Sequence, residues 1–364
     1  MDERLCLLGL RLVPGVGPKR IRILLDRYGS AAAAWRERAK WEELPGFGPG
    51  LAVAARRVGE DAVREHWARL EALGARVVTP ADADYPAGLR HMPAPPPILF
   101  VRGQLPTEAQ GWLAIVGTRR ATPQGLRTAW SLARDLAAVG VAVVSGLARG
   151  IDGAAHRGAL DGHGRTVAVL GCGLDFAYPP EHADLMEEIA ARGALVTEYP
   201  LGVQPQPGHF PTRNRLIAAM AQAVVLVEGS RRSGAMKTVT LAAELGREVM
   251  AVPGDVGRWS SEGPNQLLRE GATLVRHAAD VLESMGWTAV GLAAAAGEAP
   301  DAAGGGDSAA DRIIACLRAN GAMTVDELAA SLGMPAEALV GAVMGLELTG
   351  RVVRHAGSRF ALPQ

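Results

Sequence analysis

Short apolar runs alternate with longer amphipathic stretches in the central part of the chain, between residues 111 and 285. Helical patterns lie between most of the runs, and this alternation is typical of a parallel sheet covered on both faces. Ligands of such sheets bind at the carboxyl ends of the strands. The predicted strands are Leu113–Val116, Val141–Ser145, Thr166–Leu170, Leu195–Glu198, Ala223–Val227, Glu248–Val252 and Thr273–Val275.

Residues 1–85 have apolar positions at helical spacing and predict a separate helical domain. Pro14-Gly15-Val16-Gly17 and Pro45-Gly46-Phe47-Gly48 each precede a helix and resemble paired helix-hairpin-helix (SAM-like) motifs, whose turns offer N–H groups to phosphate. Eight basic residues and two acidic ones lie between Arg11 and Lys40, so the first turn is a candidate DNA contact. The alternative is a plain packing module. The candidate contacts are Gly15, Gly17, Lys19 and Arg20.

The remaining boundaries follow from composition. In the predicted 86–285 domain, a proline-rich run at residues 93–97 leads into an expected edge strand, Ile98–Phe100. Residues 286–307 are rich in Ala and Gly and predict a flexible linker. Residues 308–364 predict a winged helix, with a capping box at Thr324 and Glu327 and a hairpin around Gly357. Its expected recognition helix, Pro335–Thr349, contains no Lys or Arg, which favours a structural or protein-contact role over DNA binding.

Charge and motif content exclude several classes of protein. The 364 residues carry 38 Lys+Arg against 38 Asp+Glu, so a nucleic-acid site must be a local basic patch. The three cysteines form no C-x-x-C pair, and we expect no metal and no cofactor, since G-x-G-x-x-G is also absent. No signal peptide or membrane-spanning run appears, so we expect a cytoplasmic protein.

Three turns follow predicted strands and contain glycines. Gly117-Thr118-Arg119-Arg120 combines close backbone approach, a helix start and charged arginines, all of which suit an anion. The second turn runs from Ser145 to Asp152, and Asp152 is the expected N-cap of the next helix. The third contains Cys172, which is expected to be a small buried thiol. The plain alternative is a set of tight turns with solvated arginines.

Two further segments carry candidate binding chemistry. Phe210 stands near Arg213 and Arg215, and a ring for stacking beside cations for phosphates suits single-stranded nucleic acid. Alternatively, Phe210 belongs to the core and the arginines to the surface. Ser233 and Gly234 could cradle an anion at a helix start, but Lys237 comes too late for a P-loop.

No catalytic constellation is evident. The G-x-S-x-G elbow is absent, and His156 and His209 are expected to make ordinary hydrogen bonds. The roles of Glu198 and Glu228, which end strands, stay open.

Together the turns resemble the DNA-processing protein A family (DprA, also called Smf). The resemblance extends over about 170 residues, and its motifs occur in the family's order. The matching segments are Val116–Arg119, Ser145–Asp152, Val169–Asp175 with Tyr178-Pro179, Glu198–Pro200, Phe210–Arg215, Ser233–Ala235 and Val252–Gly254.

The resemblance implies an extended Rossmann-like domain that forms homodimers, binds and protects single-stranded DNA, and helps to load the RecA recombinase during natural transformation. It implies no catalysis. Arg119 would bind phosphate, Phe210 would stack on a base, and Arg213 and Arg215 would contact the DNA backbone. The expected site residues are Gly117, Thr118, Arg119, Ser145, Gly146, Arg149, Phe210, Arg213, Arg215, Ser233, Gly234 and Lys237.

The chain departs from the family pattern at two positions. Lys237 adds a charge after the Ser-Gly turn, and Pro264 removes an N–H donor from the Gly263–Asn265 turn, which we therefore expect not to bind. An alternative of another class is a nucleotide phosphoribohydrolase of a related fold. Its signature would fall between Glu228 and Glu244, but the Gly-Gly pair is missing there.

Overall fold

The computed structural model contains two compact units, Met1–Glu298 and Ala299–Gln364, which we describe separately. It describes residues 1–287 without a gap. In the second unit it describes residues 313–314, 316–318, 321–334, 339, 343, 346, 352–355 and 359–362.

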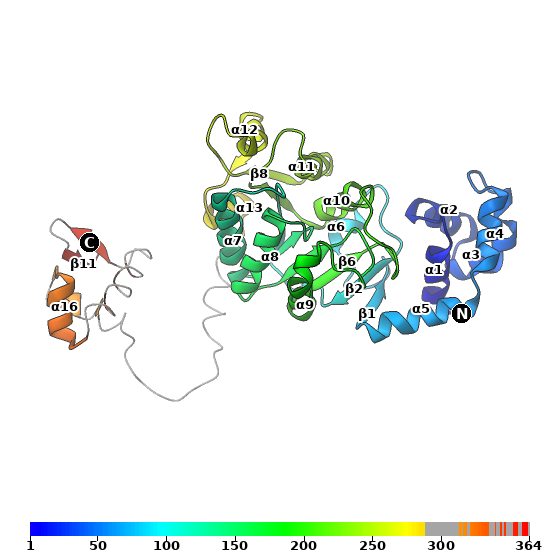
Figure 1. The fold of residues 1–364 in the computed structure, drawn as a ribbon, viewed down its shortest axis with the longest axis horizontal. Helices are drawn as coiled ribbons and strands as arrows, with labels where there is room; N and C mark the ends of the chain where they lie inside the picture. Colours follow the sequence, from blue (N-terminus) through cyan, green and yellow to red (C-terminus); the bar gives the residue numbers. More distant parts are fainter. Residues whose placement is uncertain are drawn as a thin grey trace. The chain divides into compact units, whose positions relative to one another are not determined.

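A mixed sheet forms the centre of the first unit (Figure 1). Its strand order is β1-β2-β6-β5-β4-β3-β7-β8-β9. The pairs β1–β2 and β2–β6 are antiparallel, and every other pair is parallel, which gives the expected Rossmann-like core. The strands are β1 Ala75–Val78, β2 Leu99–Gly103, β3 Gly111–Val116, β4 Val141–Ser145, β5 Thr166–Val169, β6 Ala194–Thr197, β7 Ala223–Leu226, β8 Glu248–Ala251 and β9 Thr273–Leu274.

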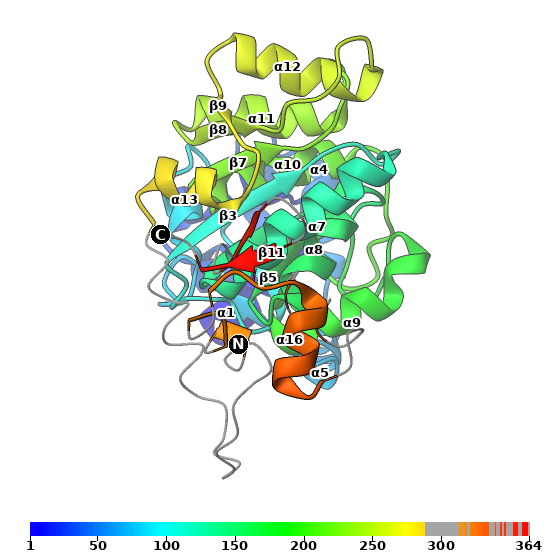
Figure 2. The same cartoon turned by 90° about the vertical axis from the view of Figure 1, so that its left-hand side faces the viewer.

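Helices cover both faces of the sheet because successive strand side chains point to opposite sides. In β3, Leu113 and Ile115 pack under α7 and α8, which lie side by side (Figure 2), whereas Ala114 and Val116 belong to the cluster that contains α10 and α11. The helices of this domain are α6 Ala87–Arg90, α7 Pro123–Ala138, α8 Ile151–Asp161, η2 Pro180–His182, α9 Ala183–Arg192, α10 His209–Met220, α11 Gly234–Glu244, η3 Trp259–Ser261, α12 Glu262–Arg269 and α13 Ala278–Met285.

The N-terminal segment is helical, as expected, and lies beyond the β1 edge of the sheet (Figure 1). Buried side chains such as Leu8, Trp35 and Trp41 form one continuous cluster with buried residues of β1, β2 and α9. The helices are α1 Glu3–Leu12, α2 Pro18–Tyr28, α3 Ala31–Arg36, η1 Arg38–Glu43, α4 Pro49–Arg57 and α5 Glu60–Ala72.

Two sequence predictions at this edge need correction. β1 lies inside residues 1–85, for which the sequence predicts a separate helical domain, yet it pairs with β2 as part of the sheet. The strand expected at Ile98–Phe100 is β2, but it is not an edge strand because β1 pairs along its outer side. The pairing is non-local and antiparallel, which the apolar pattern alone did not reveal.

The described parts of the second unit have the local features that were predicted. Helix α16, Val325–Leu332, begins with the capping box of Thr324 and Glu327. Strands β10, Val353–His355, and β11, Arg359–Ala361, form an antiparallel hairpin. The linker prediction, apart from its first two residues, and most of the expected recognition helix lie outside the described residues.

Candidate nucleic-acid interface

A cavity of about 760 Å³ lies where the strand order changes direction. β3 pairs with β4 on one side and with β7 on the other, and such a switch point is where open parallel sheets bind ligands. The cavity wall includes parts of the turns after β3 and β4, of the Ser233–Lys237 segment and of α10. It is lined by Val116, Gly117, Thr118, Arg119, Arg120, Ala148, Asp152, Tyr178, Pro207, Phe210, Pro211, Arg213, Asn214, Ile217, Ser233, Gly234, Ala235, Lys237, Thr238 and Trp259.

The turn after β3 is held in place by contacts to Glu228 and Ile151. The Thr118 N–H donates to the Glu228 carbonyl at 2.7 Å, and a side chain at Gly117 would come within 2.5 Å of Ile151. The Glu228 carboxylate accepts from the N–H and hydroxyl of Thr122, at 2.9 and 2.6 Å, so its role is structural. Arg119, which follows Thr118 in this turn, is exposed at the cavity.

The turn after β4 packs against the first turn. Gly150 has a φ of 75°, and a Cβ there would lie 2.3 Å from the Thr118 carbonyl oxygen. Gly150, not Asp152, is the N-cap of α8, which corrects the sequence prediction. Asp152 instead accepts from the N–H groups of Gly146 and Ala148, at 3.1 and 3.4 Å, and burial raises its pKa to about 6. The second turn is therefore held in shape by an internal carboxylate.

Phe210 is half-buried on the first turn of α10 and faces the cavity. Its ring lies 5.1 Å from that of Tyr178, and the Arg119 guanidinium carbon lies 5.4 Å from the ring centroid. The third turn leaves room for this ring, since a Cβ at Gly171 would approach it within 3.0 Å. A partly exposed ring beside a cation is thus present at the cavity, as the sequence pattern predicts.

The two arginines of α10, which were expected to be free for DNA phosphates, both bond to acceptors within the protein. Arg213 is 4% exposed and donates to the Gly146 carbonyl at 2.9 Å, and burial lowers its pKa to about 10. Arg215 contacts both carboxylate oxygens of Glu198 at 2.5 Å and does not line the cavity. Arg213 nevertheless lines the cavity, so its contact to the DNA backbone stays a prediction, whereas the position of Arg215 does not favour such a contact. The two residues are two positions apart and lie on different sides of the helix, and each guanidinium binds a different buried acceptor.

Three more of the predicted site residues also make contacts within the protein. The Ser145 hydroxyl is buried and donates to the Ile115 carbonyl at 2.6 Å. Arg149 lines a small adjoining pocket and is paired with Glu181. Ser233 caps α11 by accepting from the Met236 N–H at 3.3 Å.

Gly234 and Lys237 are exposed at the cavity, at the start of α11. Nothing lies within 4 Å of a Cβ placed at Gly234, so a ligand has room to approach this helix start. Within residues 1–287, neither Arg119 nor Lys237 forms an ion pair. These cations are thus available to an external anion.

The N-terminal turns bind each other. Arg20 donates to the carbonyls of Gly15 and Gly46, at 2.6 and 3.2 Å, and its guanidinium lies 5.9 Å from the ring centroid of buried Phe47. Gly17 is the N-cap of α2, and the neighbouring Lys19 is exposed. Arg20, a candidate DNA contact from sequence, therefore joins the two hairpins.

Two titratable groups near the cavity are buried. Cys172 is buried, as the sequence predicts, and burial raises the pKa of its thiol to about 11. His156 contacts the Thr166 hydroxyl at 2.7 Å through Nδ1, and burial lowers its pKa to about 3. Neither group lines the cavity. Two residues that do line it, Tyr178 and Trp259, were not assigned to the site from sequence. Trp259 stands alone in a polar loop, and no local pattern would have identified it.

No helix among the described residues is both long and apolar enough to cross a membrane. Comparison with known proteins agrees with the fold. Residues 76–286 match the family described as DNA recombination-mediator protein A, and residues 297–358 match the DprA winged helix domain. The chain is 45% identical to a putative DNA processing protein DprA of Mycobacterium tuberculosis, over 76% of this chain and 74% of the relative. It is 35% identical to DNA processing protein DprA of Bacillus subtilis, over 58% and 72%.

Solved structures give the same result. DNA processing protein A of Streptococcus pneumoniae superposes with a TM-score of 0.60 and 30% identity, covering 76% of this chain and 95% of that one. The Helicobacter pylori protein, whose structure concerns its single-stranded DNA binding mode, superposes with a TM-score of 0.53 and 30% identity, covering 58% and 95%. With its Rossmann-like sheet and C-terminal winged helix domain, this chain belongs to the DNA recombination-mediator protein A (DprA/Smf) family.

Proposed function

We propose that the chain binds single-stranded DNA in the switch-point cavity and acts in DNA recombination, including natural transformation. The observation that carries the proposal is the pairing of Arg119, exposed and without an ion-pair partner in residues 1–287, with the half-buried ring of Phe210. An aromatic ring beside free cations is the usual arrangement of a site for unstacked nucleic acid.

The cavity offers two kinds of interaction, base stacking and charge. Phe210 offers a face on which one base can stack, and Arg119 and Lys237 offer charge to phosphates on either side. The exposed start of α11 at Gly234 adds N–H groups that suit an anion. A base inside a duplex is already stacked and paired, so it cannot enter the cavity without paying for extrusion. This difference would make the site selective for single strands.

The wider role follows the family. The Helicobacter pylori relative has a described single-stranded DNA binding mode, and we propose the same ligand here. We further propose that the chain acts in the cytoplasm as a homodimer, protects single strands and helps to load the RecA recombinase. In this role it would bind and position DNA without catalysing a reaction.

The alternative, a phosphoribohydrolase, requires a carboxylate beside a bound nucleotide. Glu244 ends the 11-residue helix α11, whose start lies at the cavity, so it is about 15 Å from the site at 1.5 Å per residue. Asp152, the carboxylate that lines the cavity, is occupied by two backbone N–H groups. Release of free base from nucleoside monophosphates would support the alternative, and its absence supports a binding role.

The test is a set of anisotropy titrations with labelled oligo-dT and with duplex, each at several salt concentrations. We expect tighter binding to the single strand, and we expect Phe210→Ala to weaken it by about 1–3 kcal/mol. Arg119→Ala should flatten the dependence of log K on log salt by about 0.7 if it neutralises one phosphate. Equal affinity for single strands and duplex, or an unchanged salt slope in Arg119→Ala, would contradict the proposed site.

A further inference from the structure

A second aromatic residue lines the same cavity. Trp259 begins the short helix η3, in the connection between β8 and α12, and its side chain is 46% exposed. An exposed indole is costly to leave in water, because a large apolar ring gains free energy on burial. Phe210 comes from α10, so the two rings reach the cavity from different elements.

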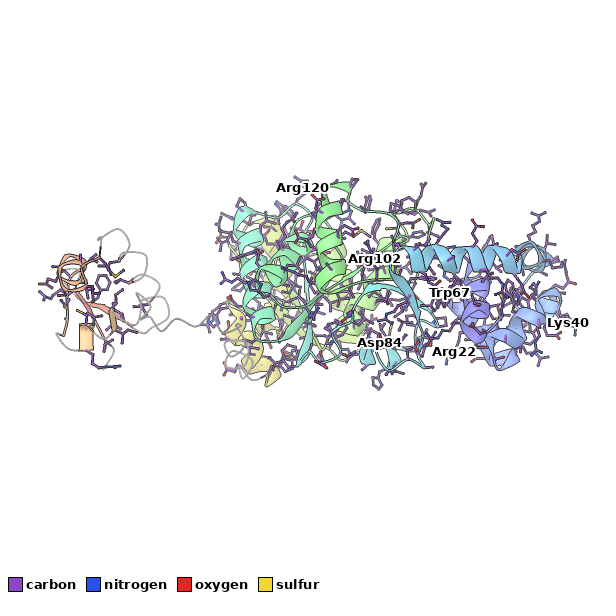
Figure 3. All side chains as sticks on the ribbon, turned by 90° about the horizontal axis from the view of Figure 1, so that it is seen from below. Arg22, Lys40, Trp67, Asp84, Arg102 and Arg120 are labelled. Carbon is purple, nitrogen blue, oxygen red and sulfur yellow. The ribbon has the colours of Figure 1, made fainter. Side chains whose placement is uncertain are left out.

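Each ring is paired with one of two consecutive arginines. The Arg119 guanidinium carbon lies 5.4 Å from the Phe210 ring centroid, and that of Arg120 lies 5.9 Å from the Trp259 ring centroid. Arg120 is exposed at the outer edge of the domain (Figure 3) and, within residues 1–287, has no ion-pair partner. The single turn after β3 therefore supplies a cation to each of two aromatic platforms.

The loop that carries Trp259 is fixed to the rest of the site. The Gly229 N–H donates to the Ser260 carbonyl at 2.6 Å, and the Gly263 N–H donates to the Gly229 carbonyl at 2.8 Å. Asn265 bonds both the N–H and the carbonyl of Gly254, at 3.1 and 2.9 Å. Gly263–Asn265 lies in the first turn of α12, and these bonds hold that turn and the loop that carries the indole beside the loop that precedes α11.

We infer that Trp259 is a second base-stacking residue, with Arg120 as its phosphate partner, so that the cavity takes two separated bases of one single strand. The inference rests on the proposed function, because it extends the same site. The cavity volume of about 760 Å³ lies in the upper half of the range of roughly 300–1,000 Å³ that ligand pockets span. Arg119 and Arg120, adjacent in the chain, are positioned to contact phosphates between the two bases.

The experiment uses the full chain and the shortest oligo-dT that still binds with full affinity, so that the strand cannot slide. A series of such strands, each with one abasic residue, is titrated against the wild type, Trp259→Ala and Phe210→Ala. We expect two sensitive positions in the wild type, of which each variant loses a different one. Trp259→Ala should also weaken binding to the intact strand ~5-fold to ~150-fold, the range expected for one stacked base.

Trp259→Phe keeps a ring but loses the indole. It should bind within about 3-fold of the wild type, because phenylalanine still stacks. Its intrinsic fluorescence should be quenched less by DNA than that of the wild type, which has seven tryptophans. Val256→Ser, a change at a 97% exposed residue of the same loop that does not line the cavity, is the matched control and should leave affinity unchanged.

The outcomes separate the two hypotheses. One sensitive position in the wild type, lost in Phe210→Ala alone, would overturn the role of Trp259 and leave the proposed function intact. Unchanged affinity in Trp259→Ala would have the same meaning. Absence of single-strand binding by the wild type would overturn both.

Discussion

The cavity and the N-terminal hairpins use similar residues for different purposes. In both regions a glycine turn precedes a helix, and an arginine lies against a phenylalanine: Arg119 against Phe210 at 5.4 Å, and Arg20 against Phe47 at 5.9 Å. Arg20, however, donates to two backbone carbonyls, and Phe47 is only 3% exposed. Arg119 is exposed, and Phe210 faces a cavity.

The two regions differ in how much of the charge and ring surface the protein itself already uses. A ligand needs charge and ring surface that the protein has not already used. Pairing of Arg20 with the Gly15 and Gly46 carbonyls holds two hairpins together, whereas Arg119 keeps its hydrogen-bonding capacity for a ligand. The predictions below test this distinction between used and available cations, from the largest expected effect to the smallest.

The largest effect is expected where a buried cation is removed. Arg215→Ala leaves the Glu198 carboxylate, 5% exposed, without its partner, and should lower the free energy of unfolding by about 3 kcal/mol. Arg119→Ala removes an exposed side chain and should change it by less than about 0.5 kcal/mol. Urea denaturation at neutral pH measures both. The double variant Arg215→Gln with Glu198→Gln should recover part of the loss, and equal stability of the two single variants would remove the distinction.

Affinity for single-stranded DNA, in contrast to stability, should depend on the exposed arginine. Arg119→Ala should weaken oligo-dT binding by about 1.5–3 kcal/mol, because it removes a charge-assisted contact to phosphate. Arg20→Ala should change affinity less than about 2-fold, because its guanidinium is occupied within the N-terminal domain. Lys19→Ala, at an exposed neighbouring residue, is the matched control. If Arg20→Ala or Lys19→Ala weakened binding as much as Arg119→Ala, the hairpins would have to be included in the interface.

Buried His156, in the domain that forms the cavity, predicts that the stability of the fold depends on pH. His156 has a pKa lowered to about 3 by burial, helped by the nearby charges of His182, Arg213 and Arg157. Its Nε2 atom has no hydrogen-bond partner in the described residues, so a proton added there is unfavourable. The unfolded chain takes up this proton below about pH 6.5 and the folded chain does not, so stability is lost as the pH falls through that value.

This group alone should make the protein about 2 kcal/mol less stable at pH 5 than at pH 7. His156→Asn, which cannot titrate and keeps an N–H donor near Thr166, should show a pH 5 to pH 7 difference smaller by that amount. Denaturant titrations of both proteins at the two pH values give the comparison, in which the shift of Asp152 cancels. An identical pH dependence in both proteins would show that His156 is protonated in the folded state.

The smallest effect concerns the hairpins themselves. Arg20→Ala should lower the free energy of unfolding by about 1 kcal/mol, the usual net value of a hydrogen bond between protein groups, since it releases the Gly15 and Gly46 carbonyls to water. Lys19→Ala should leave stability within about 0.5 kcal/mol. Thermal unfolding followed by circular dichroism would detect the difference. A stability loss in Lys19→Ala as large as in Arg20→Ala would argue against the specific bridge.

Much of the fold could be predicted from local pattern. The seven strands predicted in the central domain are all present within one or two residues of their expected bounds, because apolar runs between helices mark buried parallel strands. The sheet edge was not predictable in this way. The pairing of β1 with β2, and of β2 with β6, joins segments that are far apart in sequence.

The candidate site was predicted in outline. Gly117, Arg119, Phe210, Gly234 and Lys237 meet at one cavity because the carboxyl ends of β3 and β7 lie together at the switch point. Strand-end position and residue type selected the glycines and cations, whereas Phe210 was selected as a ring beside two arginines and by the family resemblance. Trp259 was not selected, since it lies in a loop whose distance from Phe210 depends on how α12 packs against the Gly229 loop.

By itself, the sequence determined which residue types follow which strands, and hence that candidate phosphate-binding and stacking groups gather at one edge of a parallel sheet. Only the tertiary structure decided which of those groups stay available. Arg119 and Arg213 are both predicted site residues and both line the cavity, yet Arg119 is exposed and Arg213 is 4% exposed and bonded to the Gly146 carbonyl. The physical reason is that an arginine donates to whatever acceptor its position presents, and that position is set by packing between distant segments.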